Sequence, residues 1–324
     1  MDRRKALGYL SALGLFGIYG SRLLTPEVTK TASLTESSAE SPLATISISN
    51  NKLNNINQFS SVTSEIPIQN IKTDLIKAVM QTPDNAVVDY LYKIKNFDKN
   101  FKSDVLLSED NFFILKRLSR RLNRAQTVIG YMNFSILDFP MLVKYSKNYP
   151  AIGKFTDAEI DLIEQLVFRS AVDYGFFGDK LINNINDKIS KQHLSKISNS
   201  GQYLYKDHAY KLFKRIQSDI GERVILTSGV RSLMKQLQLF TAKAVNTGGN
   251  LSRASRSLAP PGHSYHGIGD FDIGDISLGK LNFTQKFSDT DIYKKLVDLG
   301  YIKIRYQSDN KFGVRYEPWH IKVS

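Results

Sequence analysis

The chain has 324 residues, and 42% of them are hydrophobic, so one large or two ordinary domains can each bury a core. It contains no cysteine, which excludes disulfides, cysteine nucleophiles and thiolate metal ligands and leaves His and carboxylates to bind any metal. The formal net charge is +13, which suits anionic lipid or an anionic cell-wall polymer. Because the Lys and Arg residues are scattered, without a basic run interleaved with aromatics, we expect no nucleic-acid partner.

The first 24 residues have the pattern of an export signal. Arg3 and Arg4 precede an apolar run over residues 6–20, which is short for a membrane-spanning helix. The paired arginines resemble a twin-arginine signal, which predicts export to the periplasm or cell envelope. No A-x-A cleavage site ends the run, so an uncleaved N-terminal membrane anchor and an ordinary buried helix are the alternatives.

The rest of the chain divides into three predicted parts. Residues 25–72 are rich in Ser, Thr and Asn and are typical of a linker. Residues 73–199 are predicted to be mostly helical, because apolar residues recur at spacings of three and four. Residues 200–324 have a mixed pattern of helices and short strands and are predicted to form a separate domain.

In the helical part, N-cap signals mark two of the helices. Ser108 is a predicted N-cap, and Thr156 with Glu159 forms a predicted capping box. The predicted helices in chain order cover residues 73–81, 84–94, 108–132 and 155–177.

From residue 200 onward, helices and short strands occur without the strict alternation of a doubly wound sheet, which predicts an α+β fold. Thr290 and Gly300 are the predicted caps of the last helix. The predicted helices cover residues 205–221, 232–249 and 290–300, and the predicted strands lie within 223–232, 271–277, 301–306 and 319–323.

Three of the five histidines lie in the last 62 residues, close to carboxylates. A catalytic zinc takes three protein ligands from His, Asp and Glu and leaves one position for water. His266, Asp272 and His320 would supply such a set for one Zn²⁺ ion. A polar turn before a buried strand is the alternative for "HSYHGIGDFD", and His193 and His208 are expected at the surface of helical sequence.

Glu317 precedes His320 by three residues in "YEPWH". Side chains three apart on a straight strand face opposite sides, but Pro318 disfavours a regular strand and a bend could bring Glu317 and His320 together. A Glu beside a metal is the natural general base of metal-assisted hydrolysis. A surface ion pair for Glu317, with Trp319 as ordinary core, is the alternative.

These motifs, together with "SGVRSLMKQ", resemble the zinc D-alanyl-D-alanine carboxypeptidases (VanY-like), within the lysostaphin/D-Ala-D-Ala/hedgehog type of metallopeptidase. The resemblance covers about residues 200–324 and implies that they form a zinc peptidase catalytic domain, built on a small antiparallel sheet with flanking helices. The matching residues are Ser228, Gly229, Arg231, Ser232, Gln236, Pro261, Gly262, Ser264, His266, Gly269, Glu317, Trp319 and His320.

The sequence departs from this family in one spacing. The usual ligand Asp follows the His by seven residues, whereas here the aspartates stand four and six residues after His266, at Asp270 and Asp272. Asp272 is the preferred ligand because it lies in "FDI", similar to the apolar–Asp–apolar strand of the family, and because alternation in a strand is expected to turn neighbouring residues to opposite faces. Asp270 is the alternative ligand or, if Asp272 binds the metal, a residue that orients a His ring. His263 is not expected to be a ligand.

The resemblance also implies roles around the metal. Arg231 would stabilise the oxyanion or clamp a substrate carboxylate, with a surface ion pair as the alternative. Ser264 and Gln236 would orient substrate or brace Arg231, and Tyr265 and Trp319 are expected as walls or core.

The implied activity is hydrolysis of peptidoglycan stem peptides, with release of a terminal D-Ala as the first hypothesis. An endopeptidase with the same zinc chemistry is the second. A non-catalytic wall-binding protein on a degenerate peptidase fold is the third, and the sequence predicts no oligomeric state.

Overall fold

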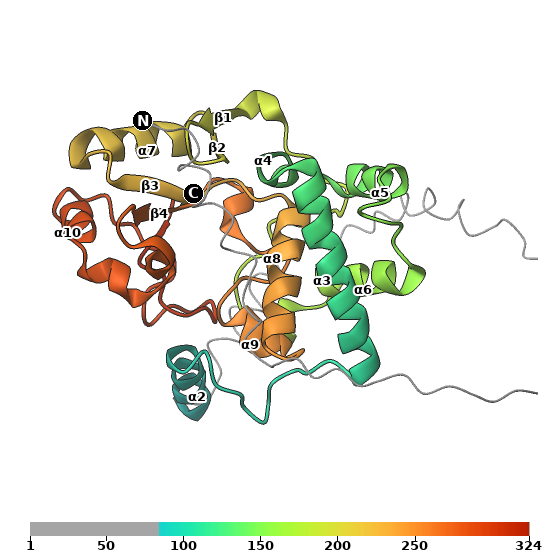
Figure 1. Ribbon diagram of the computed structural model, residues 1–324. Helices are drawn as coiled ribbons and strands as arrows, with labels where there is room; N and C mark the ends of the chain where they lie inside the picture. Colours follow the sequence, from blue (N-terminus) through green and yellow to red (C-terminus); the bar gives the residue numbers. More distant parts are fainter. Residues whose placement is uncertain (1–83, 324) are drawn as a thin grey trace, which may run out of the picture. The chain divides into compact units, whose positions relative to one another are not determined.

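The computed structural model describes residues 84–323 (Figure 1). The predicted signal or anchor, the predicted linker and the predicted helix over residues 73–81 lie outside the described residues. No helix within residues 84–323 is both long and apolar enough to cross a membrane.

The described elements follow the mixed order expected from the sequence. The α-helices are α2 (Asp84–Lys95), α3 (Glu109–Ile129), α4 (Tyr131–Phe134), α5 (Phe139–Asn148), α6 (Asp157–Phe168), α7 (Ala209–Ile220), α8 (Leu233–Asn246), α9 (Leu251–Ser255) and α10 (Asp291–Asp298). The strands are β1 (Leu194–Ile197), β2 (Gln202–Tyr205), β3 (Val224–Ser228), β4 (Phe271–Asp275) and β5 (His320–Ile321). Short 3₁₀ helices are η3 (Ala171–Tyr174), η4 (Lys191–His193), η5 (Tyr265–Gly267), η6 (Gly279–Phe283) and η7 (Gln285–Asp289).

The predicted N-caps are confirmed, whereas the last helix ends one residue earlier than predicted, with Leu299 instead of Gly300 as its C-cap. Ser108 and Thr290 each accept a hydrogen bond from a backbone N–H in the first turn of α3 and α10. Thr156 and Glu159 form both bonds of the capping box at the start of α6. These bonds satisfy backbone donors that a helix leaves unpaired at its N-terminus.

One hydrophobic core joins the helical part to α8. Leu115, Leu118 and Leu122 of α3 pack in the same cluster as Leu237 and Phe240 of α8. Figure 1 shows α3 and α8 side by side, with α6 beside them. Helix α8 is therefore covered by residues that precede the predicted catalytic domain.

The second hydrophobic core lies against one face of a three-stranded antiparallel sheet, whose strand order is β3-β4-β5. Residues that alternate along the strands, such as Leu226, Phe271 and Ile321, point into a cluster with Phe213 of α7 and Leu296 of α10. The opposite face of the sheet consequently carries Asp272 and His320. The predicted α+β fold with a small antiparallel sheet and flanking helices is confirmed.

Three local predictions differ from the structure. Residues 175–190 contain no helix, because α6 ends at Phe168 and the following 3₁₀ turn stops at Gly175, whose φ is 78°. The predicted strand over residues 301–306 is reduced to a bridge between Ile304 and Ile321, since β5 has only two residues to pair with. The hairpin β1–β2 was not predicted, although the turn with Asn199 and Gly201, both at positive φ, marks it.

Candidate metal centre

The register of the sheet aligns three polar residues across its strands. Ser228 of β3 pairs with Asp272 of β4, and Asp272 pairs with His320 of β5. Directly opposed residues on one face have Cβ atoms only about 4.5–5.5 Å apart. The sheet thus brings together side chains that lie almost a hundred positions apart in the sequence.

His266, Asp272 and His320 converge on one point. Asp272 Oδ1 lies 3.2 Å from His266 Nε2 and 3.1 Å from His320 Nδ1, and the three candidate ligand atoms lie within 4.8 Å of one another. All three residues are buried. Asp272 Oδ1 is also a buried oxygen without a hydrogen-bond partner, which costs free energy unless something else binds it. The donor set therefore fits a divalent cation such as Zn²⁺.

The second nitrogen of each ring has its own partner. His266 Nδ1 lies 2.8 Å from the carbonyl oxygen of Gly229, and His320 Nε2 lies 3.0 Å from Asp270 Oδ2. Metal-binding histidines usually donate the other ring N–H to such acceptors, which fixes the tautomer. With a metal bound, the nitrogen of each ring that faces Asp272 would therefore be the unprotonated one.

Gly229 follows β3 and lies so close to the neighbouring strand β2 that there is no room for a side chain. A Cβ atom at this position would lie 2.1 Å from the carbonyl oxygen of Tyr203 in β2. Only glycine lets the turn after β3 approach β2 so closely. This approach places the Gly229 carbonyl beside His266.

Asp270 lies outside the three-residue cluster but faces it. The expected separation of Asp270 from Asp272 by strand alternation is wrong, because Asp270 precedes β4 and residues two apart in a strand would share a face. The Asp270 carboxylate accepts hydrogen bonds from Arg305 and from the backbone N–H of Val323, as well as contacting His320. Burial alone would raise the pKa of Asp270, but the bonds from His320 and Arg305 outweigh it and lower the pKa.

Arg231 is ion-paired within the centre. Its Nη2 donates to Asp272 Oδ2 at 2.7 Å and its Nε donates to Ser228 Oγ at 2.8 Å. Burial favours a higher pKa for Asp272, yet His266 and Arg231 hold that pKa well below its ordinary value. Arg231 is thus not a surface residue paired with a distant carboxylate.

Gln236 contacts Arg231, whereas Ser264 lies at the start of the turn that carries His266. Gln236, on α8, donates to the Arg231 carbonyl and accepts from the N–H of Gly262, so it ties the two turns together. It is 2% exposed. Ser264 is also buried and begins the 3₁₀ turn that carries His266.

The predicted bend at Glu317 is present. The N–H of His320 donates to the carbonyl of Glu317 at 3.1 Å, which closes a turn through Pro318. Glu317 Oε2 lies 3.9 Å from His320 Nδ1, on the side where the ligand atoms converge. Burial raises the pKa of Glu317 to about 7, although the charges of Arg315 and His320 act in the opposite direction.

The pKa values of the two histidines are shifted in opposite directions. Burial and the charge of Arg231 lower the pKa of His266 to about 4. Burial also acts to lower the pKa of His320, but the neighbouring carboxylates of Asp270 and Asp272 raise it to about 9. A cation in this position would replace the proton on His320 Nδ1.

The remaining residues singled out in the sequence lie around this centre. His263 Nδ1 lies 3.0 Å from the carbonyl of Asp179 and its ring contacts Phe176, so it faces away from the ligand cluster. Tyr265 and Trp319 are buried, as expected of walls or core. His193 and His208 are exposed, in a 3₁₀ turn and at the N-cap of α7.

Sequence reasoning missed Arg305. This residue is 9% exposed, and its guanidinium lies 3.5 Å from the centre of the Tyr265 ring. Its only signal in the sequence is a charged residue within the apolar alternation of "YIKIRY".

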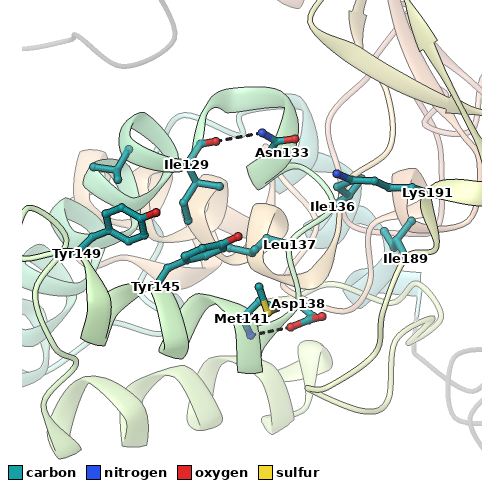
Figure 2. A pocket seen from close by; sticks show the side chains of 11 residues that line it. Ile129, Asn133, Ile136, Leu137, Asp138, Met141, Tyr145, Tyr149, Ile189 and Lys191 are labelled. Carbon is teal, nitrogen blue, oxygen red and sulfur yellow. Dashed lines mark hydrogen bonds between the residues drawn. The ribbon is translucent and has the colours of Figure 1, made fainter.

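A separate cavity of about 390 Å³ lies between α3, α5 and the segment before β1 (Figure 2). Figure 2 shows Tyr145 of α5 and Tyr149, which follows α5, on one side and Ile189 and Lys191 on another. None of the converging site residues lines this cavity.

The comparison with known protein families gives a match to the C-terminal part of the chain, which contains the candidate metal centre. Residues 202–323 match the family model VanY, described as D-alanyl-D-alanine carboxypeptidase. No curated protein sequence matches the chain.

Two solved structures are similar in part. The first is a vancomycin-resistance D,D-pentapeptidase VanY variant from a VanB-type cassette in complex with Zn(II), at 24% identity, over 44% of this chain and 85% of that chain, with a TM-score of 0.31. The second is VanYB in complex with D-Alanine-D-Alanine, at 25% identity, over 40% of this chain and 77% of that chain, with a TM-score of 0.31.

Proposed function

We propose, from the premise that residues 202–323 form a VanY-type D-alanyl-D-alanine carboxypeptidase domain, that this protein is a zinc-dependent peptidase of peptidoglycan stem peptides. Release of the terminal D-Ala is the proposed reaction. The observation that carries the proposal is the convergence of His266, Asp272 and His320 beside Glu317.

The donor set matches a catalytic rather than a structural metal site. Three protein ligands leave a fourth position of a tetrahedral ion for water or substrate. His266 Nε2, Asp272 Oδ1 and His320 Nδ1 would hold the ion. When bound, zinc polarises the scissile carbonyl and lowers the pKa of water to roughly 7.

Glu317 is the proposed general base and acid. Its Oε2 lies on the side of the ligand atoms, so it can accept a proton from attacking water and return it to the leaving amine. The buried environment excludes bulk water, which strengthens every charge interaction with the reacting groups.

Arg231 is proposed to stabilise the developing negative charge on the carbonyl oxygen or to bind the terminal carboxylate of the substrate. Two of its nitrogens hold Ser228 and Asp272, which fixes the plane of the guanidinium. Its remaining nitrogen, Nη1, is the proposed contact for the substrate. Gln236 braces Arg231 through its carbonyl, and Ser264 is proposed to contact substrate at the entrance of the turn.

The proposed location is the periplasm or cell envelope. The supporting features are the twin-arginine pattern in residues 1–24 and the basic charge of the chain. An uncleaved segment would serve as an anchor, and peptidoglycan peptides are accessible from that compartment.

The direct test is digestion of a pentapeptide ending in D-Ala-D-Ala by the full chain loaded with zinc, with and without a chelator, followed by mass spectrometry. We expect loss of one alanine, abolished by the chelator and absent in Asp272→Asn. Cleavage inside the stem or a cross-bridge would instead identify the endopeptidase. Binding to purified sacculi without zinc or turnover would identify the non-catalytic wall-binding protein and overturn the proposal.

A further inference from the structure

A buried ion pair lies immediately behind the proposed zinc ligands. Arg305 donates from Nε to Asp270 Oδ2 at 2.5 Å and from Nη2 to Asp270 Oδ1 at 3.3 Å. Asp270 Oδ2 is also the oxygen that lies 3.0 Å from His320 Nε2. The side chains of Arg305 and Asp270 are 7% and 0% exposed. The two ions therefore interact mainly with the protein rather than with water.

The strand register explains why Arg305 reaches this position. Ile304 bridges Ile321 in antiparallel orientation, so the next residue, Arg305, lies opposite His320. On its other side, His320 pairs with Asp272 of β4. His320 is thus held between the metal-binding row of the sheet and the Arg305 segment.

Arg305 also contacts the turn that carries the other histidine. Its guanidinium lies 3.5 Å from the centre of the Tyr265 ring, which precedes His266 in η5. The Tyr265 carbonyl accepts backbone hydrogen bonds from Gly269 and Asp270. Arg305 consequently contacts a residue next to each His ligand, Tyr265 beside His266 and Asp270 beside His320.

Burying two charged side chains costs free energy of desolvation, so a buried ion pair contributes little net stability. A role other than stability is therefore expected for the charges of Arg305 and Asp270. Here the carboxylate has a second role, because it is the acceptor for the ring nitrogen of His320 that does not face Asp272. An acceptor of this kind keeps the proton on Nε2 and leaves Nδ1 as the donor to a metal.

We infer that Arg305 is a positioning residue of the zinc centre. It fixes Asp270, Asp270 fixes the ring and tautomer of His320, and the contact with Tyr265 fixes the turn that carries His266. The inference rests on the proposed zinc site, but it concerns the affinity for the metal rather than the peptide that is cut.

The experiment measures zinc affinity of the full chain by competition with a chromophoric chelator. Arg305→Met removes the charge while keeping much of the volume, and loss of such an outer partner typically weakens metal binding about 10- to 100-fold. Arg305→Lys restores one charge without the planar fork, so we expect an affinity between those of the wild type and Arg305→Met.

Arg256 offers a matched control. It forms a buried two-point ion pair with Asp104 and lies 4.9 Å from the Phe101 ring, remote from the proposed ligands in the contacts it makes. Arg256→Met should therefore lower stability while leaving zinc affinity within about twofold of the wild type, since sites without shared partners act independently.

A second readout separates positioning from folding. The visible spectrum of the Co²⁺-substituted protein reports ligand geometry, so it should change in Arg305→Met and remain unchanged in Arg256→Met. Equal zinc affinity and equal Co²⁺ spectra for wild type and Arg305→Met would overturn the inference. If Arg305→Met does not fold by circular dichroism, wild-type affinity in the folded Arg305→Lys and Asp270→Asn variants would overturn it equally.

These outcomes are distinguishable from failure of the proposed function. A wild-type protein that binds zinc but cleaves no wall peptide would refute the peptidase and leave the affinity comparison valid. A wild-type protein that binds no divalent ion would refute both.

Discussion

Both aspartates that the sequence offered as ligands, Asp270 and Asp272, contact the ring of His320. Asp272 Oδ1 contacts its Nδ1, and Asp270 Oδ2 contacts its Nε2. The two carboxylates are therefore not competing candidates for one role, because they take opposite sides of a single ring. An Asp that orients a ligand histidine is expected to be less important for zinc binding than an Asp that binds the ion.

The candidate ligands and the preference for Asp272 over Asp270 could be predicted from residue types and the family pattern, but the partners that hold Asp270 could not. Cysteine is absent, so His and carboxylates had to form the set. Residues two apart share a strand face, so alternation does not distinguish Asp270 from Asp272. Only the position of Arg305 and of the Val323 N–H shows that Asp270 is already engaged.

Glu317 provides the prediction at this scale. We expect Glu317→Gln to retain zinc, because its carboxylate lies beside the cluster and not within it. Turnover should fall about 10²- to 10⁴-fold, the range for loss of a positioned acid–base group. Zinc content by elemental analysis and kcat by mass-resolved digestion would test both parts.

The control for Glu317→Gln is Asp272→Asn, which should lose zinc and turnover together. If Glu317→Gln cleaved peptide at the wild-type rate, Glu317 would have no part in proton transfer. If it lost zinc as completely as Asp272→Asn, Glu317 would be a ligand instead of a base.

At the scale of elements, local signals predicted the helices more completely than the short strands. Ser108, Thr156 and Thr290 are recognisable from sequence because a cap bonds to residues only two or three positions away. The pairing of Ser228, Asp272 and His320 depends on contacts across the whole catalytic part, which no local pattern contains. The family motifs supplied that information, and residues outside them, such as the Gly229 carbonyl and Arg305, were missed.

The contact between α3 and α8 contains a buried lysine. Lys235 of α8 donates to Gln126 of α3 at 2.5 Å and to Gln238 at 2.8 Å. Burial, together with the charge of Arg231, lowers the pKa of Lys235 from 10.5 to about 7. Its amine is therefore protonated more readily in the unfolded chain than in the folded protein.

This difference predicts how stability varies with pH. Between about pH 7 and pH 10.5 the unfolded chain binds one more proton at Lys235 than the folded protein, so the free energy of unfolding rises with pH across that window. The rise is at most about 1.4 kcal/mol per pH unit, and the destabilising effect is fully present below pH 7.

The test compares wild type with Lys235→Met by urea denaturation at pH 7, 8 and 9, with zinc in equal excess. We expect the wild type to gain stability relative to the variant at each step, because titration of every other group is common to both proteins. Parallel curves would show that Lys235 is solvated in the folded protein. The absolute offset is not part of the test, since the variant also leaves the oxygens of Gln126 and Gln238 without their donor.

For the whole molecule, the important feature is that the family match and the hydrophobic core have different boundaries. The family match begins at residue 202, and the predicted catalytic domain begins two residues earlier, at residue 200. The core around α8, however, is built largely from residues before that point, including Leu118, Phe134 and Leu166. The helical part is thus proposed to support the zinc centre through α8, whose Gln236 ties the Arg231 and Gly262 turns together.

This arrangement predicts that residues 200–324 alone do not form a stable domain, whereas residues 84–324 do. The shorter fragment would expose Leu233, Leu237 and Phe240 of α8, and burial of each such side chain contributes roughly 1.5–3 kcal/mol. The combined loss approaches the whole stability of an ordinary domain, which is about 5–15 kcal/mol. We expect the longer fragment to unfold cooperatively and to bind zinc with the affinity of the full chain, and the shorter one to bind a hydrophobic dye and to bind zinc weakly. Matched midpoints of unfolding and matched zinc affinities for the two fragments would show instead that the peptidase domain is complete without the helical part.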